Sequence, residues 1–221
     1  KDLREVARVV FPADKDLDAL PLYIDGPINV EGPSSVGADT ANQHPDDIIS
    51  RRSVRIRPGR RVSFGSYFNA FPASYWRRWT VADSVTLRVR TSGAGSLIVY
   101  RSNARGVSQR VEDRRVNGST TCEFELTLAP FGDGGWYWFD LISDEEGMVL
   151  DSASWLVPSH GRPVGRVTLG VTTFNRPDYC VNTIKTIAQA DGLDEVLDGI
   201  DDVLEVNALT FVQSFRQKGG Q

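Results

Sequence analysis

Residues 85–157 repeatedly alternate between apolar and polar positions, with the period of two that is typical of β-strands. In 85–90 and again in 122–128, every second side chain is apolar and the others are charged or threonine. Because neighbouring side chains of a strand point to opposite faces, this pattern predicts strands with one buried face. Apolar positions predict further strands in residues 97–99, 136–142 and 148–157, with a turn at Gly93-Ala94-Gly95 before the first of these.

Short strands separated by turns are the usual pattern of β-sandwiches and β-barrels. Residues 1–160 are therefore predicted to form a mostly β, sandwich- or barrel-like domain. Near its start, residues 6–12 predict a short strand, whereas residues 26–50 are rich in glycine, proline, serine and asparagine and predict a long loop. Residues 158–165 combine glycine and proline again and predict a linker to a second domain.

A different pattern follows the linker. Residues 167–173 are β-rich and lead into Phe174-Asn175-Arg176-Pro177, after which Val181, Ile184, Ile187 and Ala188 fall on roughly one helical face. Since proline is common at the first helical position, a helix is expected to begin at Pro177. A strand, a tight turn and a helix form the first unit of many nucleotide-binding α/β domains, whose ligands lie beyond the carboxyl ends of the strands. The free N–H groups of the helix N-terminus favour an anion there.

The composition is that of an ordinary globular protein. The 221 residues are 40% hydrophobic and 24% charged, which is enough for one large or two small domains. A net charge of −4 gives no reason to expect nucleic acid as a partner. No apolar run approaches the roughly 18 residues of a membrane span, and no signal peptide is expected. The two cysteines, Cys122 and Cys180, are expected to be buried, reduced residues of a cytoplasmic chain.

Six arginines lie close together between residues 51 and 61. One interpretation is the solvated face of an edge strand, where charge prevents pairing with other chains. The other is a surface for an anionic lipid or a diphosphate, which implies a peripheral contact with a membrane. The first is favoured, and both stay open. His44 has no second histidine and no cysteine nearby, so no metal site is predicted.

Two aromatic clusters, in residues 64–79 and 136–139, also allow two interpretations. Aromatic rings bury the largest area per residue, so these clusters fit a core or a domain interface. Flat ring faces also suit the C–H faces of sugars, which makes the clusters candidates for a sugar-stacking surface. The residues singled out for this role, or for an interface, are Tyr75, Trp76, Trp79, Trp136 and Trp138.

Three segments carry a resemblance to a known family. The strand ending Thr173-Phe174-Asn175-Arg176-Pro177 resembles the first strand of inverting GT-A glycosyltransferases. Together with SYFNAFPASYWRRWT (66–80) and FGDGGWYWFD (131–140), it is similar to the polymerising galactofuranosyltransferases that build the galactan of arabinogalactan in cell walls. The resemblance extends from about Ser63 to Thr186 and identifies the chain as the N-terminal part of such an enzyme.

The resemblance implies a GT-A domain of α/β type that begins in residues 165–221 and is incomplete there. It implies transfer of galactofuranose from UDP-galactofuranose to a lipid-linked galactan, with inversion. Thr173, Phe174, Asn175 and Arg176 would surround the donor nucleotide, and Arg176 would contact its diphosphate.

In the family, a divalent metal, manganese or magnesium, neutralises the leaving group, and a carboxylate base activates the acceptor. Both sets of residues lie further along, so no catalytic residue is assigned and the 221 residues alone are expected to be inactive. The resemblance also implies a homo-oligomer in the cytoplasm, at the inner face of the plasma membrane. The alternative is a carbohydrate-binding or oligomer-assembly β module without catalysis of its own.

Overall fold

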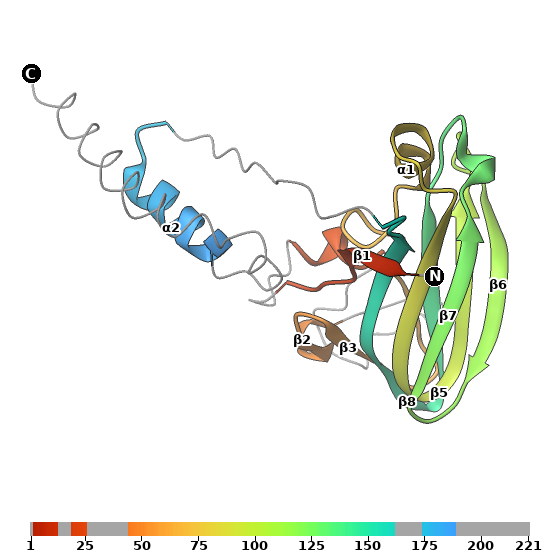
Figure 1. The fold of residues 1–221 in the computed structure, drawn as a ribbon. Helices are drawn as coiled ribbons and strands as arrows, with labels where there is room; N and C mark the ends of the chain where they lie inside the picture. Colours follow the sequence, from red (N-terminus) through yellow and green to blue (C-terminus); the bar gives the residue numbers. More distant parts are fainter. Residues whose placement is uncertain (1, 13–18, 26–43, 162–173, 189–221) are drawn as a thin grey trace, which may run out of the picture. The chain divides into compact units, whose positions relative to one another are not determined.

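The computed structural model describes residues 2–12, 19–25, 44–161 and 174–188. The chain divides into two compact units, Lys1–Gly161 and Arg162–Gln221. The first unit carries all the described strands and the second carries the helix α2 (Figure 1). No helix among the described residues is long and apolar enough to cross a membrane.

The described strands of the first unit form one eight-stranded sheet in which every pairing is antiparallel. The order β2-β3-β8-β5-β6 makes up its main path, while β1 and β4 also pair with β8, and β7 pairs with β5. This confirms a mostly β domain, but two packed sheets or a closed barrel are not confirmed. The strand bounds are β1 Leu3–Arg8, β2 Ile48–Ser50, β3 Ser53–Ile56, β4 Arg61–Ser63, β5 Ser84–Ser102, β6 Ser108–Val116, β7 Thr120–Thr127 and β8 Tyr137–Pro158.

Two long strands, β5 and β8, form the centre of the sheet and pair with each other from Thr86↔Leu156 to Arg101↔Tyr137. The predicted turn at Gly93-Ala94-Gly95 is therefore wrong, and so is the division of β8 into two strands. Gly93 has φ +104°, and a Cβ there would lie 2.8 Å from the carbonyl oxygen of Gly147. Glycine thus allows β5 to bend close to β8 without ending, and the register shifts between Gly93 and Gly95.

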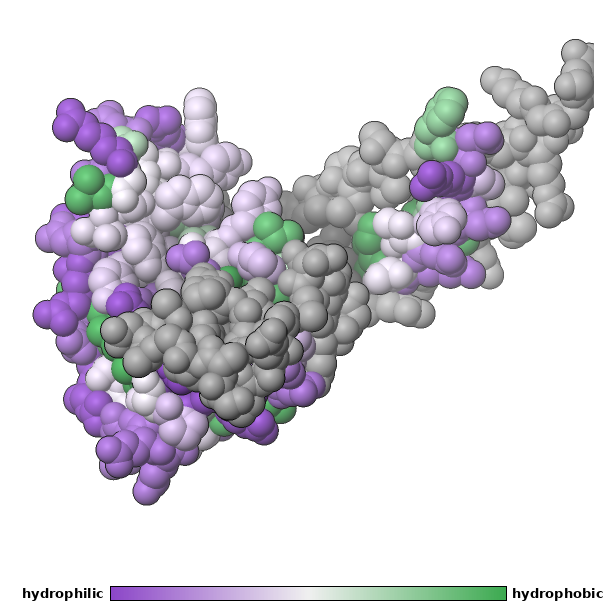
Figure 2. All heavy atoms as spheres, turned by 180° about the vertical axis from the view of Figure 1, so that it is seen from behind, coloured by the Kyte–Doolittle hydropathy of each residue, from purple (hydrophilic) through white to green (hydrophobic). Residues whose placement is uncertain are grey.

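The core is one continuous cluster of apolar side chains. Trp155 and Tyr137 are its largest fully buried side chains. Each satisfies its polar atom: Trp155 Nε1 donates to Asn69 O at 3.1 Å, and the Tyr137 hydroxyl donates to Thr127 O at 2.8 Å. Burial raises the pKa of Tyr137. The β6 edge is charged and exposed, as the hydrophilic border of the sheet in Figure 2 shows. Such an edge disfavours pairing with another chain.

The described residues of the first unit also contain four short helical elements: η1 Leu20–Leu22, η2 Pro45–Asp47, α1 Ala73–Trp79 and η3 Ala129–Phe131. The helix α1, which the sequence did not predict, lies at one end of the sheet (Figure 1). Part of the predicted loop, from Pro45 to Ser50, instead forms η2 and β2. The rest of that loop, 26–43, lies outside the described residues.

In the second unit, α2 extends over Pro177–Ala188, which confirms the predicted helix and its start. Asn175, two residues earlier, has a left-handed backbone with φ 51°. This conformation is one that asparagine tolerates better than most residues, and it suits the sharp turn before the helix. The predicted strand 167–173 lies outside the described residues.

Candidate functional site

Three of the five aromatic residues singled out are on the surface near α1. Tyr75 and Trp79 are 59% and 74% exposed and lie four positions apart on this helix, so they share one side of it. Trp136, 45% exposed, directly precedes β8. The backbone N–H of Ser74 donates to Gly135 O at 3.2 Å, which holds the first turn of α1 next to the segment that carries Trp136.

The helix α1 ends in a polar cap. The Thr80 hydroxyl donates to Trp76 O at 2.7 Å and accepts from the backbone N–H of Ala82 at 3.1 Å. Trp76 O also accepts from the backbone N–H of Thr80 at 3.2 Å, so the backbone and the side chain of Thr80 both close the last turn of the helix. The exposed aromatic residues of α1 are therefore held on a short but fixed element.

The other two aromatic residues are half-buried, and each packs against a neighbouring ring. The ring of Trp76 stacks on Phe71 with 5.7 Å between centroids, and Trp138 stacks on Tyr100 at 5.6 Å. A Cβ on Gly65 would lie 3.0 Å from the Trp138 ring, so this tryptophan covers the backbone of Gly65 closely. Trp76 and Trp138 thus support the packing interpretation, whereas the role of Tyr75, Trp79 and Trp136 in binding sugar stays a prediction.

A buried carboxylate, Asp140, lies next to the Tyr100–Trp138 pair and was not singled out from the sequence. Asp140 is fully buried, and Arg61 Nε donates to its Oδ2 at 2.7 Å. Arg61 Nη2 also donates to the Tyr100 hydroxyl at 3.2 Å. Burial raises the pKa of Asp140, while the Ser63 hydroxyl and the Arg61 guanidinium act against it. Within the described part of the chain, Oδ1 has no hydrogen-bond partner.

Asn69 is a second residue that the sequence analysis missed, within the motif 66–80. Its Oδ1 accepts from the backbone N–H of Val10 at 2.9 Å. Its Nδ2 donates to Val10 O at 2.9 Å and to Tyr23 O at 2.7 Å. Asn69 is 1% exposed, so these bonds join three distant segments inside the domain. A lone polar residue between aromatic ones was the sequence signal that could have identified it.

The arginine cluster is largely engaged in contacts inside the domain. Arg57 Nε donates to both carboxylate oxygens of the fully buried Asp47, at 2.9 and 2.8 Å. Arg61 pairs with Asp140, and Arg52 Nη2 lies 3.5 Å from Ser154 Oγ. These contacts give at least three of the six arginines a structural role. The predicted edge strand is wrong, because β3 pairs with β2 on one side and with β8 on the other. The membrane contact stays a prediction.

The predicted donor-nucleotide residues are only partly described, because Thr173 lies outside the described residues. Phe174 is 92% exposed, and the Arg176 guanidinium lies over the Tyr179 ring, 5.9 Å from its centroid. The backbone N–H of Cys180 donates to Arg176 O at 3.2 Å, within the first turn of α2. Phe174, Asn175 and Arg176 are thus placed at the start of a helix, as predicted, and their role in binding a nucleotide stays a prediction.

The described residues define an antiparallel β domain with exposed aromatic residues beside a short helix, followed by a separate unit that contains α2. The sequence model of the galactofuranosyltransferase 2 N-terminal family matches residues 6–158. A galactofuranosyltransferase GlfT2 of Mycolicibacterium smegmatis is 38% identical over 200 residues, which cover 88% of this chain and 29% of the relative. GlfT2 of Mycobacterium tuberculosis is 36% identical over 200 residues, which again cover 88% of this chain and 29% of the relative. The chain spans less than a third of the length of these relatives.

The C-terminal segment matches a second family, which the sequence analysis did not consider. The sequence model of Pup-like proteins matches residues 181–221. The prokaryotic ubiquitin-like protein Pup of Brachybacterium faecium is 62% identical over 52 residues, which cover 24% of this chain and 82% of the relative. The chain therefore belongs to the galactofuranosyltransferase 2 N-terminal family through residues 6–158, and its C-terminal segment belongs to the Pup-like family.

Proposed function

We propose that this chain is the N-terminal part of a galactofuranosyltransferase that transfers galactofuranose from UDP-galactofuranose to a lipid-linked galactan, with inversion. The observation that carries the proposal is the family match over residues 6–158 together with the identity to the two GlfT2 relatives. An alignment that covers 88% of 221 residues, or about 194 residues, cannot end before about residue 194, so its range includes Phe174-Asn175-Arg176.

In this proposal, the β domain accompanies a GT-A domain that begins at about residue 165. Thr173, Phe174, Asn175 and Arg176 line the donor site, and the permanent charge of Arg176 contacts the diphosphate. The start of α2 also attracts the negatively charged diphosphate, because the first N–H groups of a helix carry a partial positive charge. The longer protein works as a homo-oligomer in the cytoplasm, at the inner face of the plasma membrane, where a lipid-linked acceptor is within reach.

A divalent metal, manganese or magnesium, would neutralise the leaving diphosphate of such an enzyme. The described residues do not fit that metal, since they hold no group of three or more histidine, cysteine, aspartate or glutamate side chains that could ligate it. No step is therefore assigned to a metal at these residues, and the 221 residues alone are proposed to be inactive.

The test compares two proteins in one assay with UDP-galactofuranose and a galactofuranose-containing acceptor. The longer protein, of the length of the GlfT2 relatives, is expected to extend the acceptor, whereas the 221-residue chain is expected to transfer nothing. Absence of transfer by a folded longer protein would refute the proposed activity. Transfer by the shorter chain would instead refute the proposal that its catalytic residues lie elsewhere.

The Pup-like match favours a different function for residues 181–221, which is an alternative to the start of a GT-A domain in the same residues. We propose that residues 181–221 act as a ubiquitin-like module, on the strength of the 62% identity to the Brachybacterium faecium relative. The test is competition: the full chain should displace labelled Pup of that organism from a purified protein that binds it. A chain that ends at Gly161 is the control and should not compete. Equal competition by both chains, or by neither, would contradict the proposal.

A further inference from the structure

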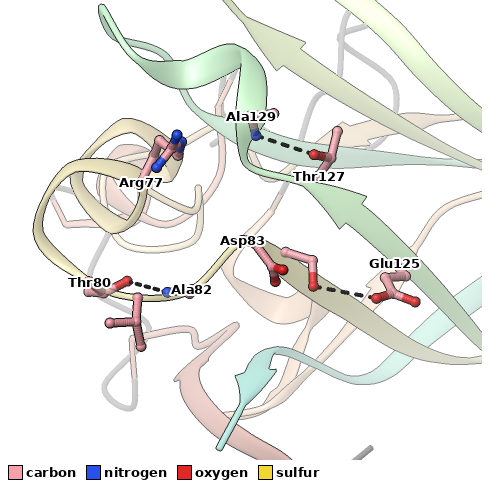
Figure 3. Close-up of a pocket in the computed structure, with 9 residues that line it drawn as sticks. Arg77, Thr80, Ala82, Asp83, Glu125, Thr127 and Ala129 are labelled. Carbon is pink, nitrogen blue, oxygen red and sulfur yellow. Dashed lines mark hydrogen bonds between the residues drawn. The ribbon is translucent and has the colours of Figure 1, made fainter. Parts of the chain in front are cut away.

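A pocket of about 410 Å³ lies where α1, the start of β5, the end of β7 and η3 meet (Figure 3). Its volume falls in the range of small-ligand sites. Its polar lining consists of three charged residues, Arg77, Asp83 and Glu125, and three hydroxyl residues, Thr80, Ser84 and Thr127. Its apolar lining includes Val81, which is 60% exposed. Neither the sequence motifs nor the family match assigns a role to this pocket.

The walls of the pocket are fixed by hydrogen bonds of their own. The Thr127 hydroxyl accepts from the backbone N–H of Ala129 at 3.2 Å, and Asp83 O accepts from the N–H of Leu128 at 2.8 Å. The first bond fixes the turn after β7, and the second joins the end of β7 to the start of β5. With the Thr80 bonds at the end of α1, they set the backbone on three sides of the pocket. A ligand would therefore meet a largely preformed site.

The charged side chains of the pocket come from three different elements. Arg77 is on α1, Asp83 precedes β5 and Glu125 is on β7, where its carboxylate lies 3.4 Å from the Ser84 hydroxyl. Among the residues that the structure describes, neither the Arg77 guanidinium nor the Asp83 carboxylate makes a hydrogen bond or an ion pair. The pocket therefore presents donors and acceptors that are open to a ligand (Figure 3).

The mixture of charges decides which class of ligand fits. Two carboxylates oppose an anion such as phosphate, and the guanidinium opposes a metal cation. A neutral ring with several hydroxyl groups satisfies both kinds of side chain, because each hydroxyl can donate to a carboxylate and accept from the guanidinium. The exposed apolar side chain of Val81 suits the C–H groups of such a ring. Trp79, 74% exposed and one residue before Thr80, adds a flat aromatic surface on the same helix.

We propose that this pocket is a sugar subsite of the β domain that holds one unit of a neutral galactofuranose chain. The choice of galactofuranose rests on the proposed transferase function. The choice of a neutral polyhydroxylated ring rests on the pocket alone. The subsite would hold the acceptor chain and raise its local concentration for the rest of a longer protein.

The experiment is a titration of the full 221-residue chain, followed by backbone amide resonances. The probes are a neutral galactofuranose oligosaccharide, inorganic phosphate and calcium. Saturable shifts at Ala82, Ser84 and Ala129 are expected with the oligosaccharide alone. The absence of saturable shifts with the oligosaccharide, or saturation of the same residues by phosphate or calcium, would overturn the proposal.

Three variants make the test specific. Arg77→Ala and Asp83→Ala should each raise the Kd for the oligosaccharide by at least about fivefold, because each removes a charge-assisted hydrogen bond. Arg90→Ala is the matched control: Arg90 is an exposed arginine six residues along β5 from Ser84, roughly 20 Å of extended strand away. It should leave the Kd unchanged. Equal affinity of all three variants, or an equal loss in the control, would overturn the assignment.

Parallel assays separate this proposal from the proposed function. If a longer protein transfers galactofuranose while the pocket binds no oligosaccharide, the subsite fails and the transferase stands. If the pocket binds the oligosaccharide but a folded longer protein transfers nothing, the transferase fails and a sugar-binding pocket stands.

Discussion

Asn69 and Val10 exchange hydrogen bonds as two neighbouring residues of a sheet do, although 59 positions separate them. The side-chain Oδ1 of Asn69 accepts from Val10 N, and its Nδ2 donates to Val10 O, both at 2.9 Å. The Asn69 side chain thus makes the two hydrogen bonds to Val10 that the backbone of a neighbouring strand would otherwise make. The same Nδ2 donates to Tyr23 O, so the chain around η1 depends on it as well.

The first prediction is that Asn69→Ala lowers the free energy of unfolding by roughly 2–4 kcal/mol. The reason is that the substitution leaves the N–H and the carbonyl of Val10 without their side-chain partner, whereas Tyr23 O keeps the hydrogen bond from the Ser66 hydroxyl. Urea unfolding of the full chain measures the change. Asn117→Ala is the control, because Asn117 is exposed, and it should change the free energy by less than about 0.5 kcal/mol. Similar values for both variants would show that the Asn69 bonds contribute little.

The second prediction concerns Arg61 and its buried partner Asp140. Arg61→Ala leaves an unpaired carboxylate inside the domain and should cost about 3–5 kcal/mol at pH 8. Arg88→Ala breaks the exposed pair with Glu123 and should cost less than about 1 kcal/mol. Urea unfolding at pH 8 compares the two. Equal losses in the two variants would contradict a special role for the buried pair.

The third prediction follows from the direction of the Asp140 pKa. Burial raises this pKa above its value in the unfolded chain, so between the two values the folded state binds more protons than the unfolded state. The contribution of Asp140 to stability therefore increases as the pH falls through this window, and is least favourable above it. In Arg61→Ala the pKa should rise further, because a lowering influence is lost.

The loss caused by Arg61→Ala should consequently be smaller at pH 5 than at pH 8. The double variant Arg61→Ala, Asp140→Asn has no carboxylate to protonate and serves as the control. Unfolding free energies of wild type and both variants at the two pH values give the comparison. A loss in Arg61→Ala that is the same at both pH values would show that Asp140 does not titrate in this range.

The fourth prediction is that Gly93→Ala destabilises the domain by roughly 1–3 kcal/mol, because its φ of +104° strains an L-residue and the new Cβ would lie 2.8 Å from Gly147 O. Gly132→Ala is the matched control, since its φ is −60° and nothing lies within 4 Å of the position of its Cβ. It should be neutral or slightly stabilising. Thermal melts of both variants test this, and an unchanged melt for Gly93→Ala would contradict a bend that requires glycine.

The fifth prediction addresses the proposed donor site in a longer protein. Arg176→Ala should lower kcat/KM for UDP-galactofuranose about ten- to a hundredfold, because a charge-assisted contact to a phosphate contributes roughly 1.5–3 kcal/mol. Lys185→Ala removes a positive charge from the last turn of the same helix and serves as the control. Normal kinetics and a normal melt for Arg176→Ala would remove this residue from the site.

Much of this protein follows from the order of its residues. Alternation identified the buried faces of β7 and of the first part of β5, because the side-chain period of a strand is a local property. Proline fixes its own backbone angle, so the start of α2 at Pro177 could be predicted as well. The motif in residues 66–80 identified the family that the later comparison confirmed, since its aromatic residues occur in an unusual order.

Only the tertiary structure decided where strands continue or end and which side chains are buried. Glycine is common both in turns and in bends, so the sequence could not show that β5 continues through Gly93 until β8 was seen beside it. The same holds for the tryptophans: Trp138 is packed and Trp136 is exposed because of residues far away in the chain, such as Gly65 and Tyr100. Burial is a property of contacts between distant segments, and for that reason Asn69 and Asp140 were recognised only in the folded domain.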